Sequence, residues 1–372
     1  MNIIHLITTI NKGGAENHLY YLTKGLRKKN NITVVYYKGD NYWKKHYNKL
    51  GIKTINLSNL GTNFFSNIKK VFFLRDYIKS NKFDIVHSHL PHMEFLMFFV
   101  LIFNKYNFKY FITKHVDNNF LGGSRYPSNN FIVHLIDFIL TYKANKIICI
   151  SKAVKNYYLN KILSKNSKKY KIIYYGINKQ YKSELNYKSK IKNIPKRDVI
   201  FGSVGRLVKQ KNFELIIKSY KSFVDKADKS SCLVIAGSGP EETNLKNFAK
   251  QLNIADNIIW MGHVNNVGNV FSKIDVFCMN SKFEGLGLVL LEAMLFSKPI
   301  IATNISAIPE VVVNMKNGIL VEQNNINKFS KAMSILSDKN LRQKLSKNSH
   351  IFLNKKFNYN KMIKKTLNLY LH

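Results

Sequence analysis

The sequence predicts an α/β protein built from two doubly wound parallel sheets. Short β-branched runs alternate with helical stretches along the 372-residue chain, which is the pattern of parallel βαβ units. In the second half, every strand-like run ends in a loop that carries glycine or a charge, as expected where strand ends border a ligand crevice. A chain of this length accommodates about two domains.

The first half begins with the strand Ile3 to Thr8, the glycine-rich turn NKGGAE and a helix to about Lys28. The loop amides of such a unit can face an anion, although glycine is also common in βα turns for geometry alone. The same alternation continues, with strands expected at Ile32 to Tyr37, Asp84 to His87, Tyr110 to Thr113, Lys146 to Ile150 and Lys171 to Tyr175. Helices are expected at Asn67 to Ser80, around Phe95 to Phe103, at Phe131 to Tyr142 and, capped by Ser151, to about Leu159.

A polar, lysine-rich stretch from Lys179 to Arg197 has the composition of a linker. The second half then restarts the alternation, with strands expected at Val199 to Val204, Cys232 to Ala236, Ile258 to Met261, Asp275 to Met279 and Gly318 to Val321. The three cysteines lie in apolar strand-like runs without metal spacing, so we expect buried core residues in a reducing compartment. The N-terminus resembles a strand rather than a signal peptide, and the longest apolar run, nine residues, is too short to span a bilayer.

The stretch Asn280 to Thr303, NSKFEGLGLVLLEAMLFSKPIIAT, carries the strongest functional signal. Leu288 to Phe296 is apolar apart from Glu292, so we expect a buried helix, followed by a turn and the strand Ile300 to Thr303. A carboxylate in such surroundings is unfavourable unless it has a polar partner.

Glu284 precedes this helix, with Gly285-Leu286-Gly287 between the loop and the helix start. The glycines allow close backbone approach, and the helix N-terminus is partly positive and binds phosphates in other proteins. Two carboxylates are therefore expected to face one cleft. A purely structural interpretation stays open, in which Glu284 interacts with the helix dipole and Glu292 pairs with a core Arg or Lys.

Arg206 and Lys211 flank one turn after the strand Val199 to Val204. A guanidinium can bind two oxygens at once and an ammonium acts as a point charge, so this pair suits a diphosphate. The segment GSGPEE, residues 237–242, is a weaker match to a dinucleotide fingerprint because it lacks the third glycine and the acidic ribose residue.

Histidines gather at two predicted strand ends. His87 and His89 alternate on one side of a strand, with His92 close behind, but no carboxylate or cysteine completes a zinc set nearby, so we expect no metal there. His115 follows the strand Tyr110 to Thr113, at the end that faces the ligand crevice of a parallel sheet. A histidine in that position can also be a simple capping residue.

The formal charge is +38, and residues 1–190 hold 32 basic against 8 acidic residues. Such an excess suits nucleic acid, an anionic membrane or a phosphate-bearing substrate. A lysine-rich composition spread over solvated surfaces explains it equally well. The helix Asn67 to Ser80, with Ile68, Val71, Phe72, Leu74, Arg75 and Ile78 among lysines, could lie on an anionic membrane or could be an ordinary surface helix.

Together these motifs resemble glycosyltransferase family 4. The resemblance rests on GGAE, DIVHSH, TKH, ICISKAV, YYGIN, VGRLVKQKN, VIAGSGPEE, MGHV and FEGLGLVLLEAM with SKPIIAT, in the order and spacing of that family. It covers nearly the whole chain, thinning between Asn41 and Lys82 and after about Glu322. The pair Glu284 and Glu292 in its setting is the specific part.

The resemblance implies the GT-B fold, in which two Rossmann-like doubly wound parallel-sheet domains face each other across a cleft. Residues 1–190 would form the acceptor-binding domain and residues 191–350 the nucleotide-sugar domain, while the helix in residues 351–372 would pack back towards the first domain. A nucleotide diphosphate sugar would be the donor, with retention at the anomeric carbon and without a metal or other cofactor.

The same resemblance implies roles for individual residues. Arg206 and Lys211 would bind the donor diphosphate, Glu292 the ribose hydroxyls, and the backbone near Val264 the base. Residues of the two glycine loops and one histidine would meet the sugar and the phosphates; these are Gly13, Gly14, His115, Glu284, Gly285, Leu286 and Gly287.

We therefore expect a retaining hexosyltransferase that uses a donor such as a UDP-sugar and a glycan or lipid-linked acceptor in bacterial capsule, O-antigen or lipopolysaccharide synthesis. It is expected to be cytoplasmic, peripheral on the anionic inner face of the membrane, and without a nucleic-acid partner. One alternative is a nucleotide-sugar 2-epimerase of the same fold, for which no arginine and histidine set can be placed. The other is a non-enzymatic basic protein binding membrane or nucleic acid, which leaves Glu284 and Glu292 without a role.

Overall fold

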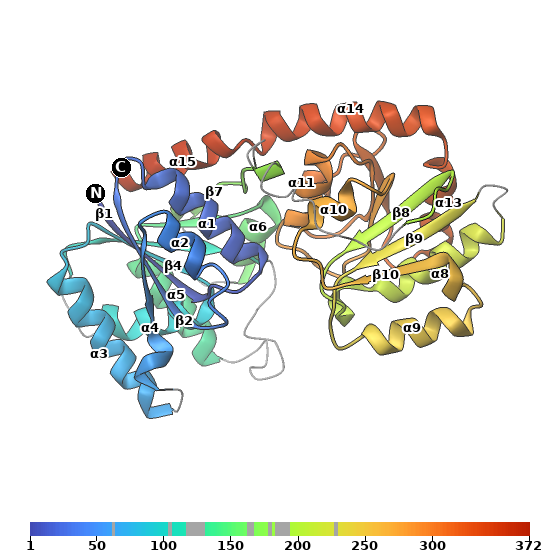
Figure 1. The fold of residues 1–372 in the computed structure, drawn as a ribbon. Helices are drawn as coiled ribbons and strands as arrows, with labels where there is room; N and C mark the ends of the chain where they lie inside the picture. The colour runs from blue at the N-terminus through green and yellow to red at the C-terminus, as the bar shows by residue number, and fades with distance from the viewer. Residues whose placement is uncertain are drawn as a thin grey trace. The chain divides into compact units, whose positions relative to one another are not determined.

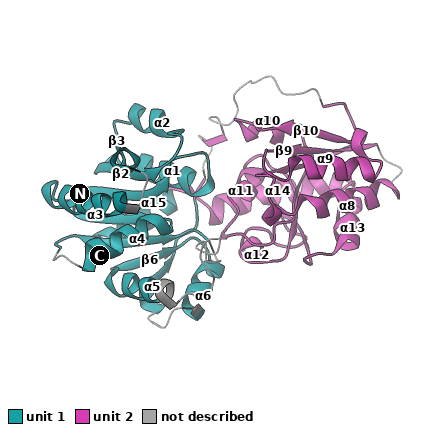
Figure 2. Cartoon of the chain, turned by 90° about the horizontal axis from the view of Figure 1, so that it is seen from below, with its two compact units in different colours: residues 1–175, 360–372 teal, residues 176–359 magenta. Residues whose placement is uncertain are grey.

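The computed structural model describes residues 1–61, 64–102, 106–116, 131–161, 167–177, 181–182, 194–226 and 230–372. They form two compact units (Figure 2), residues 1–175 with 360–372 and residues 176–359. The predicted domain boundary at residue 190 lies outside the described residues. The predicted start of the C-terminal segment, residue 351, lies inside the helix α14, Lys339–Lys356.

The first unit is a seven-stranded sheet in the order β3-β2-β1-β4-β5-β6-β7, with parallel pairing throughout (Figure 1). Its strands are β1 Asn2–Thr9, β2 Asn31–Lys38, β3 Lys53–Asn56, β4 Ile85–His89, β5 Lys109–Lys114, β6 Lys146–Cys149 and β7 Tyr170–Ile172. Its helices are α1 Gly14–Leu26, α2 Lys44–Lys49, α3 Phe64–Ser80, α4 Pro91–Ile102, α5 Phe131–Lys143, α6 Lys152–Lys161 and most of α15 Tyr359–Leu371. The strand order reverses between β1 and β4, which makes this the topological switch point.

The second unit is a six-stranded parallel sheet in the order β10-β9-β8-β11-β12-β13. Its strands are β8 Val199–Val204, β9 Ser231–Ala236, β10 Ile258–Gly262, β11 Val276–Met279, β12 Ile300–Thr303 and β13 Gly318–Val321. Its helices are α8 Phe213–Val224, α9 Glu242–Gln251, α10 Val267–Phe271, α11 Leu288–Leu295, α12 Ile308–Val311, α13 Ile326–Ile335 and α14. Here the switch point lies between β8 and β11.

The predicted fold class is confirmed, since both units are doubly wound parallel sheets. Ser151 caps α6 as expected, because its Oγ accepts a hydrogen bond from the Val154 amide at 3.0 Å. The three cysteines are buried and free. In contrast, β3 and α2 were not predicted, and they lie in the stretch where the family resemblance thins. Among the described helices, none combines the length and the apolar character needed to cross a membrane.

The YYGIN motif has a structural role in the second unit. The Ile177 amide donates to the Phe357 carbonyl at 2.9 Å, and Ile177 forms a parallel bridge with Asn358. A Cβ on Gly176 would lie 2.5 Å from the Tyr359 Cα. Because a side chain at position 176 would collide with backbone, glycine is required there for the two segments to pair.

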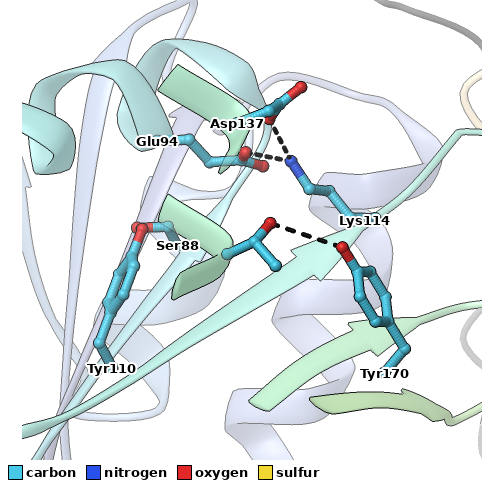
Figure 3. A network of polar contacts seen from close by, with 7 residues as sticks. Ser88, Glu94, Tyr110, Lys114, Asp137 and Tyr170 are labelled. Atoms are coloured by element: carbon cyan, nitrogen blue, oxygen red, sulfur yellow. Dashed lines mark hydrogen bonds and ion pairs between the residues drawn. The ribbon is translucent and has the colours of Figure 1, made fainter. Parts of the chain in front are cut away.

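A buried ion cluster holds the end of β5 against two helices (Figure 3). Lys114 Nζ lies 2.5 Å from Glu94 Oε2 of α4 and 3.1 Å from Asp137 Oδ1 of α5. The Lys114 and Glu94 side chains are each 5% exposed. Although burial alone lowers the pKa of Lys114, the carboxylates of Asp137 and Glu94 raise it well above its ordinary value. Lys114 is therefore charged, and its positive charge compensates the two largely buried carboxylates of Glu94 and Asp137.

Among the described side chains, five histidines are buried near the switch point of the first unit: His5, His18, His87, His89 and His115. Three of them form the histidine chain, in which His5 Nδ1 lies 3.1 Å from His89 Nε2, and His89 Nδ1 lies 3.1 Å from His115 Nε2. Burial lowers the pKa of His5 and of His115 from 6.5 to about 3. Burial, together with the neighbouring imidazoles, also lowers the pKa of the other three. All five rings are therefore neutral at pH 7.

Substitution of Lys114 by Met is expected to destabilise the first unit by about 3–5 kcal/mol, because it leaves two largely buried carboxylates without their cation. The equivalent change in an exposed ion pair of the same unit, Arg75→Met beside Asp76, is expected to have a much smaller effect, because solvent screens the two charges. Hydrogen exchange of the β4 and β5 amides measures both. Equal effects of the two substitutions would show that the buried cluster adds no stability.

The buried histidines also predict acid sensitivity. Their folded-state pKa lies below the unfolded value of 6.5, so below pH 6.5 the unfolded chain binds more protons than the folded one. The free energy of unfolding should then fall by about 1.4 kcal/mol per pH unit for each such histidine as pH drops from 6.5 towards 3. Urea denaturation of the full-length protein at pH 7.0 and 5.5 measures how steeply the free energy of unfolding of the first unit changes with pH. His5→Gln should reduce this pH dependence by the contribution of one histidine. A slope near zero would contradict the burial of neutral rings.

Candidate functional site

Two loops meet at the switch point of the second unit, one following β8 and the other following β11. The Lys282 amide donates to the Gln210 carbonyl at 2.8 Å, and Gln210 Nε2 donates to the Phe283 carbonyl at 3.0 Å. Between the same loops, Lys211 Nζ forms an ion pair with Glu284 Oε1. Their side chains are 20% and 10% exposed. Two residues that the sequence singled out separately, 73 positions apart, are thus in direct contact.

Arg206 occupies the start of the same β8 loop and is exposed. The loop is fixed by backbone contacts with the GSGPEE segment, since the Leu207 amide donates to the Ser238 carbonyl at 2.9 Å. Gly237 adopts φ +146°, and a Cβ there would lie 1.8 Å from the Gly205 carbonyl oxygen. The glycines of this segment therefore serve close packing of two loops, which places Arg206 at the strand ends.

Glu292 lies in the second turn of α11 and is 7% exposed. Its carboxylate accepts a hydrogen bond from the hydroxyl of Tyr181, which is 3% exposed. The next residue, Lys182, places its Nζ 5.1 Å from the ring centre of Phe296 at the end of the same helix. The polar partner that the sequence required for Glu292 is thus at least in part a protein hydroxyl, which sequence analysis missed because Tyr181 lies in the predicted linker.

The loop between Glu284 and α11 is buried, including Gly285, Leu286 and Gly287. Gly287 precedes the helix in the left-handed region, at φ +80°, which favours glycine. Gly285 does not adopt a positive φ. Val264 follows β10 and is half-buried; its loop joins the others because the Gly237 amide donates to the Gly262 carbonyl at 2.8 Å.

Two further polar residues at the end of β11 escaped the sequence analysis. Asn280 and Ser281 are 1% and 0% exposed, and their side-chain polar atoms have no hydrogen-bond partner within the described part of the chain. Leaving a buried polar atom unpaired costs about 1–3 kcal/mol. Buried polar atoms without a partner are uncommon in folded proteins, and at the end of β11 they lower the free energy of unfolding.

In the first unit, Gly13 and Gly14 connect β1 to α1. A Cβ on Gly13 would lie 2.3 Å from Glu16 Oε2, whereas a Cβ on Gly14 would meet nothing within 4 Å. Because the end of the flexible Glu16 side chain can move aside, packing within the described structure requires glycine at neither position.

His115 follows β5, next to the buried ion cluster, and is 7% exposed. Both of its ring nitrogens have partners in the first unit, since Nδ1 lies 2.5 Å from the Tyr175 hydroxyl and Nε2 lies 3.1 Å from His89 Nδ1. The Tyr175 ring stacks on His18 at 4.2 Å between ring centres. A hydrogen bond from His115 to any ligand would require one of these two contacts to open.

Within the described part of the chain, one group of histidines has the arrangement of metal ligands. His5, His87 and His89 can each offer one nitrogen, and these atoms lie within 4.8 Å of one another. However, His87 contacts the Tyr370 hydroxyl at 2.5 Å and Thr113 Oγ1 at 2.7 Å, and His89 uses both nitrogens in the histidine chain. A metal would have to displace several of these hydrogen bonds. The sequence pattern indicates His87 and His89 but not His5, which has the position of an ordinary strand residue.

Comparison with known proteins identifies the family. Residues 12–181 match the model described as Glycosyltransferase Family 4, and residues 186–351 match the model described as Glycosyl transferases group 1. An uncharacterized glycosyltransferase of Haemophilus influenzae is 30% identical over 281 residues, covering 74% of this chain and 72% of the relative. The O-antigen biosynthesis glycosyltransferase WclY of Escherichia coli is 28% identical over 255 residues, covering 67% and 68%.

A solved structure confirms the architecture. Anabaena HepE, crystallised in complex with UDP, superimposes with a TM-score of 0.77 at 15% sequence identity, covering 99% of each chain. At this identity the likeness shows the fold, which is the GT-B arrangement of two Rossmann-like sheets. Fold, motifs and relatives agree, and the chain belongs to the family 4-like glycosyltransferases.

Proposed function

We propose that this glycosyltransferase is a retaining, metal-independent enzyme that moves a hexose or N-acetylhexosamine from a nucleotide diphosphate sugar to a glycan or lipid-linked acceptor. The observation that carries the proposal is the cationic site of the second unit, where Arg206 and the Lys211–Glu284 pair lie on two joined loops at a switch point. Ligands bind at such points in doubly wound sheets. The UDP complex of HepE supports a uridine nucleotide.

The charge distribution suits departure of a nucleoside diphosphate. When the bond between the anomeric carbon and the phosphate oxygen breaks, negative charge grows on the phosphate, and fixed cations at Arg206 and Lys211 stabilise it. Lys211 is held in place by Glu284, so little reorganisation is needed when the donor arrives. Glu284 and the amides of residues 285–287 are assigned to the sugar and the phosphates, and Glu292 and Val264 to the nucleoside.

Retention follows if the acceptor attacks from the side of the leaving group. The acceptor oxygen then forms the new bond to the anomeric carbon, and its proton passes to the departing phosphate oxygen. No protein base is needed on the opposite face. In the first unit, the open position at Gly14 allows a phosphate to approach the backbone, and His115 is assigned to the transferred sugar.

The acceptor is assigned to surface polysaccharide synthesis, such as capsule, O-antigen or lipopolysaccharide. The named relative in O-antigen biosynthesis supports this class. An acceptor of that kind is presented at the inner face of the cell membrane, which is anionic, and the excess of basic residues in the first half of the chain favours peripheral association with it. Nucleic acid is not proposed as a partner.

Arg206→Ala and Lys211→Ala are each expected to weaken binding of a nucleotide diphosphate by about 10- to 100-fold, because each removes a charge-assisted contact worth about 1.5–3 kcal/mol. The matched control is Lys209→Ala, an exposed lysine of the same loop, which should change binding less than about threefold. Calorimetric titration with UDP and a panel of other nucleoside diphosphates measures all three.

The same proteins are then given a panel of nucleotide sugars without acceptor. Slow release of free nucleotide diphosphate supports glycosyl transfer, whereas conversion into an epimer with the nucleotide still attached would show an isomerase. Equal nucleotide binding by Arg206→Ala, Lys211→Ala and the wild type would refute the assigned site.

Tyr181→Phe tests whether the tyrosine positions Glu292 for the nucleoside. Removing the hydroxyl removes one hydrogen bond that holds the carboxylate, so the KM for the donor is expected to rise by about tenfold with kcat within about twofold, in line with the loss of one hydrogen bond to a charged group. Tyr220→Phe is the control, since it removes a buried hydroxyl bonded to Ser231 at 3.0 Å in the same unit. A fall in KM for Tyr181→Phe would mean instead that the tyrosine competes with the donor.

A further inference from the structure

Large apolar side chains are exposed on one helical layer of the first unit. The helices α3, α4 and α5 form this layer, because α4 packs against both of the others. Seven residues make up what we call the apolar face: Phe65, Ile68, Phe72, Phe95, Ile102, Leu135 and Tyr142. They are seven of the twelve large hydrophobic residues that are exposed in the described ranges, so the exposure is concentrated rather than scattered. Concentrated apolar exposure marks interaction sites.

On each helix, the spacing of these residues places them on the same, solvent-exposed side. Phe65 and Phe72, Phe95 and Ile102, and Leu135 and Tyr142 are each separated by two helical turns. Phe65 and Tyr142 are 71% exposed. The structure also corrects the sequence-based set on α3, in which all apolar residues were candidates for a membrane surface. Leu74 and Ile78 are 0% and 4% exposed and belong to the core, whereas Ile68 and Phe72 of that set are exposed. Phe65, which precedes the predicted helix, joins them in the outer stripe.

Basic side chains border the apolar face. Lys69, Lys79 and Lys82 are exposed on or just after α3. The Arg75 guanidinium lies 4.7 Å from the ring centre of Phe72, and Lys169 Nζ lies 5.6 Å from that of Tyr142. An aromatic ring with a basic group beside it is the combination that anchors proteins at the interface of a bilayer.

Acidic side chains contribute little to this surface. Glu94 of α4 and Asp137 of α5 turn inward to Lys114, and Figure 3 shows both carboxylates directed at its ammonium. The exposed Asp76 of α3 is paired with Arg75. The described layer therefore presents apolar and cationic groups together.

We infer that the apolar face docks on an anionic phospholipid surface. Its cationic border is complementary to acidic headgroups, and its rings can enter the interfacial region. A second copy of the chain is a poor partner, because two chains of formal charge +38 repel each other. The choice of a membrane as partner rests on the proposed lipid-linked acceptor, whereas the face itself is a property of the folded first unit.

Sedimentation of the full-length protein with phosphatidylglycerol-containing vesicles tests the inference, with phosphatidylcholine vesicles for comparison. The wild type should bind the anionic vesicles at 50 mM salt and lose affinity at 300 mM. Phe65→Ser/Phe72→Ser should weaken binding by about tenfold or more, and Lys69→Gln/Lys79→Gln by about fivefold for each lysine. Ile351→Ser, which removes an apolar residue that is 57% exposed on α14 of the second unit, is the matched control and should bind as the wild type does.

Four outcomes would overturn the inference. The first two are that the wild type does not bind anionic vesicles at low salt, or that both double variants bind as well as the wild type does. The other two are that Ile351→Ser loses as much binding as the double variants, or that Phe65→Ser/Phe72→Ser abolishes self-association in solution while vesicle binding persists. Calorimetric binding of UDP reports on the second unit and should be unchanged in both double variants, and hydrogen exchange of the β4 and β5 amides checks that their first unit folds. Vesicle binding without any nucleotide binding would instead count against the proposed function and leave the docking face standing.

Discussion

The ion pair between Lys211 and Glu284 is the interaction on which the geometry of the proposed donor site in the second unit depends. It connects the loops that follow β8 and β11, the two strands between which the sheet order reverses, and it is reinforced by hydrogen bonds from Lys282 and Gln210 across the same loops. Because the loops are joined before any ligand arrives, a cation and a carboxylate are held ready at the strand ends. Preorganised charge of this kind stabilises a leaving diphosphate without reorganisation during the reaction.

The first unit differs from the second in that it buries many polar groups near its own switch point. The Lys114 cluster joins β5 to α4 and α5, and His115 follows directly in the chain. Behind it, the histidine chain places three neutral rings in hydrogen-bond contact. Burial keeps these rings neutral, so each can donate with one nitrogen and accept with the other. The orientation of His115 is thus set by its neighbours His89 and Tyr175.

Most strands and helices could be predicted, because they depend on patterns among residues that are close in the sequence. Alternation of β-branched runs with helices predicted the strands of the second unit, and the motif around Glu284 and Glu292 was identifiable from spacing alone. β3 and α2 were missed because they lie in a short polar region with little periodicity. Contacts between distant residues were also out of reach: nothing local indicates that Lys211 pairs with Glu284, that Tyr181 of a linker-like stretch meets Glu292, or that His5 of an apolar strand completes a histidine cluster.

We propose that the charges of the second unit bind a nucleoside diphosphate, and a crystal structure of the protein with UDP is the decisive experiment. We expect diphosphate oxygens within hydrogen-bond distance of Arg206 and Lys211, with the ribose hydroxyls on the carboxylate of Glu292. A nucleotide bound elsewhere, with Glu292 contacting protein groups alone and no phosphate near Arg206 or Lys211, would contradict it.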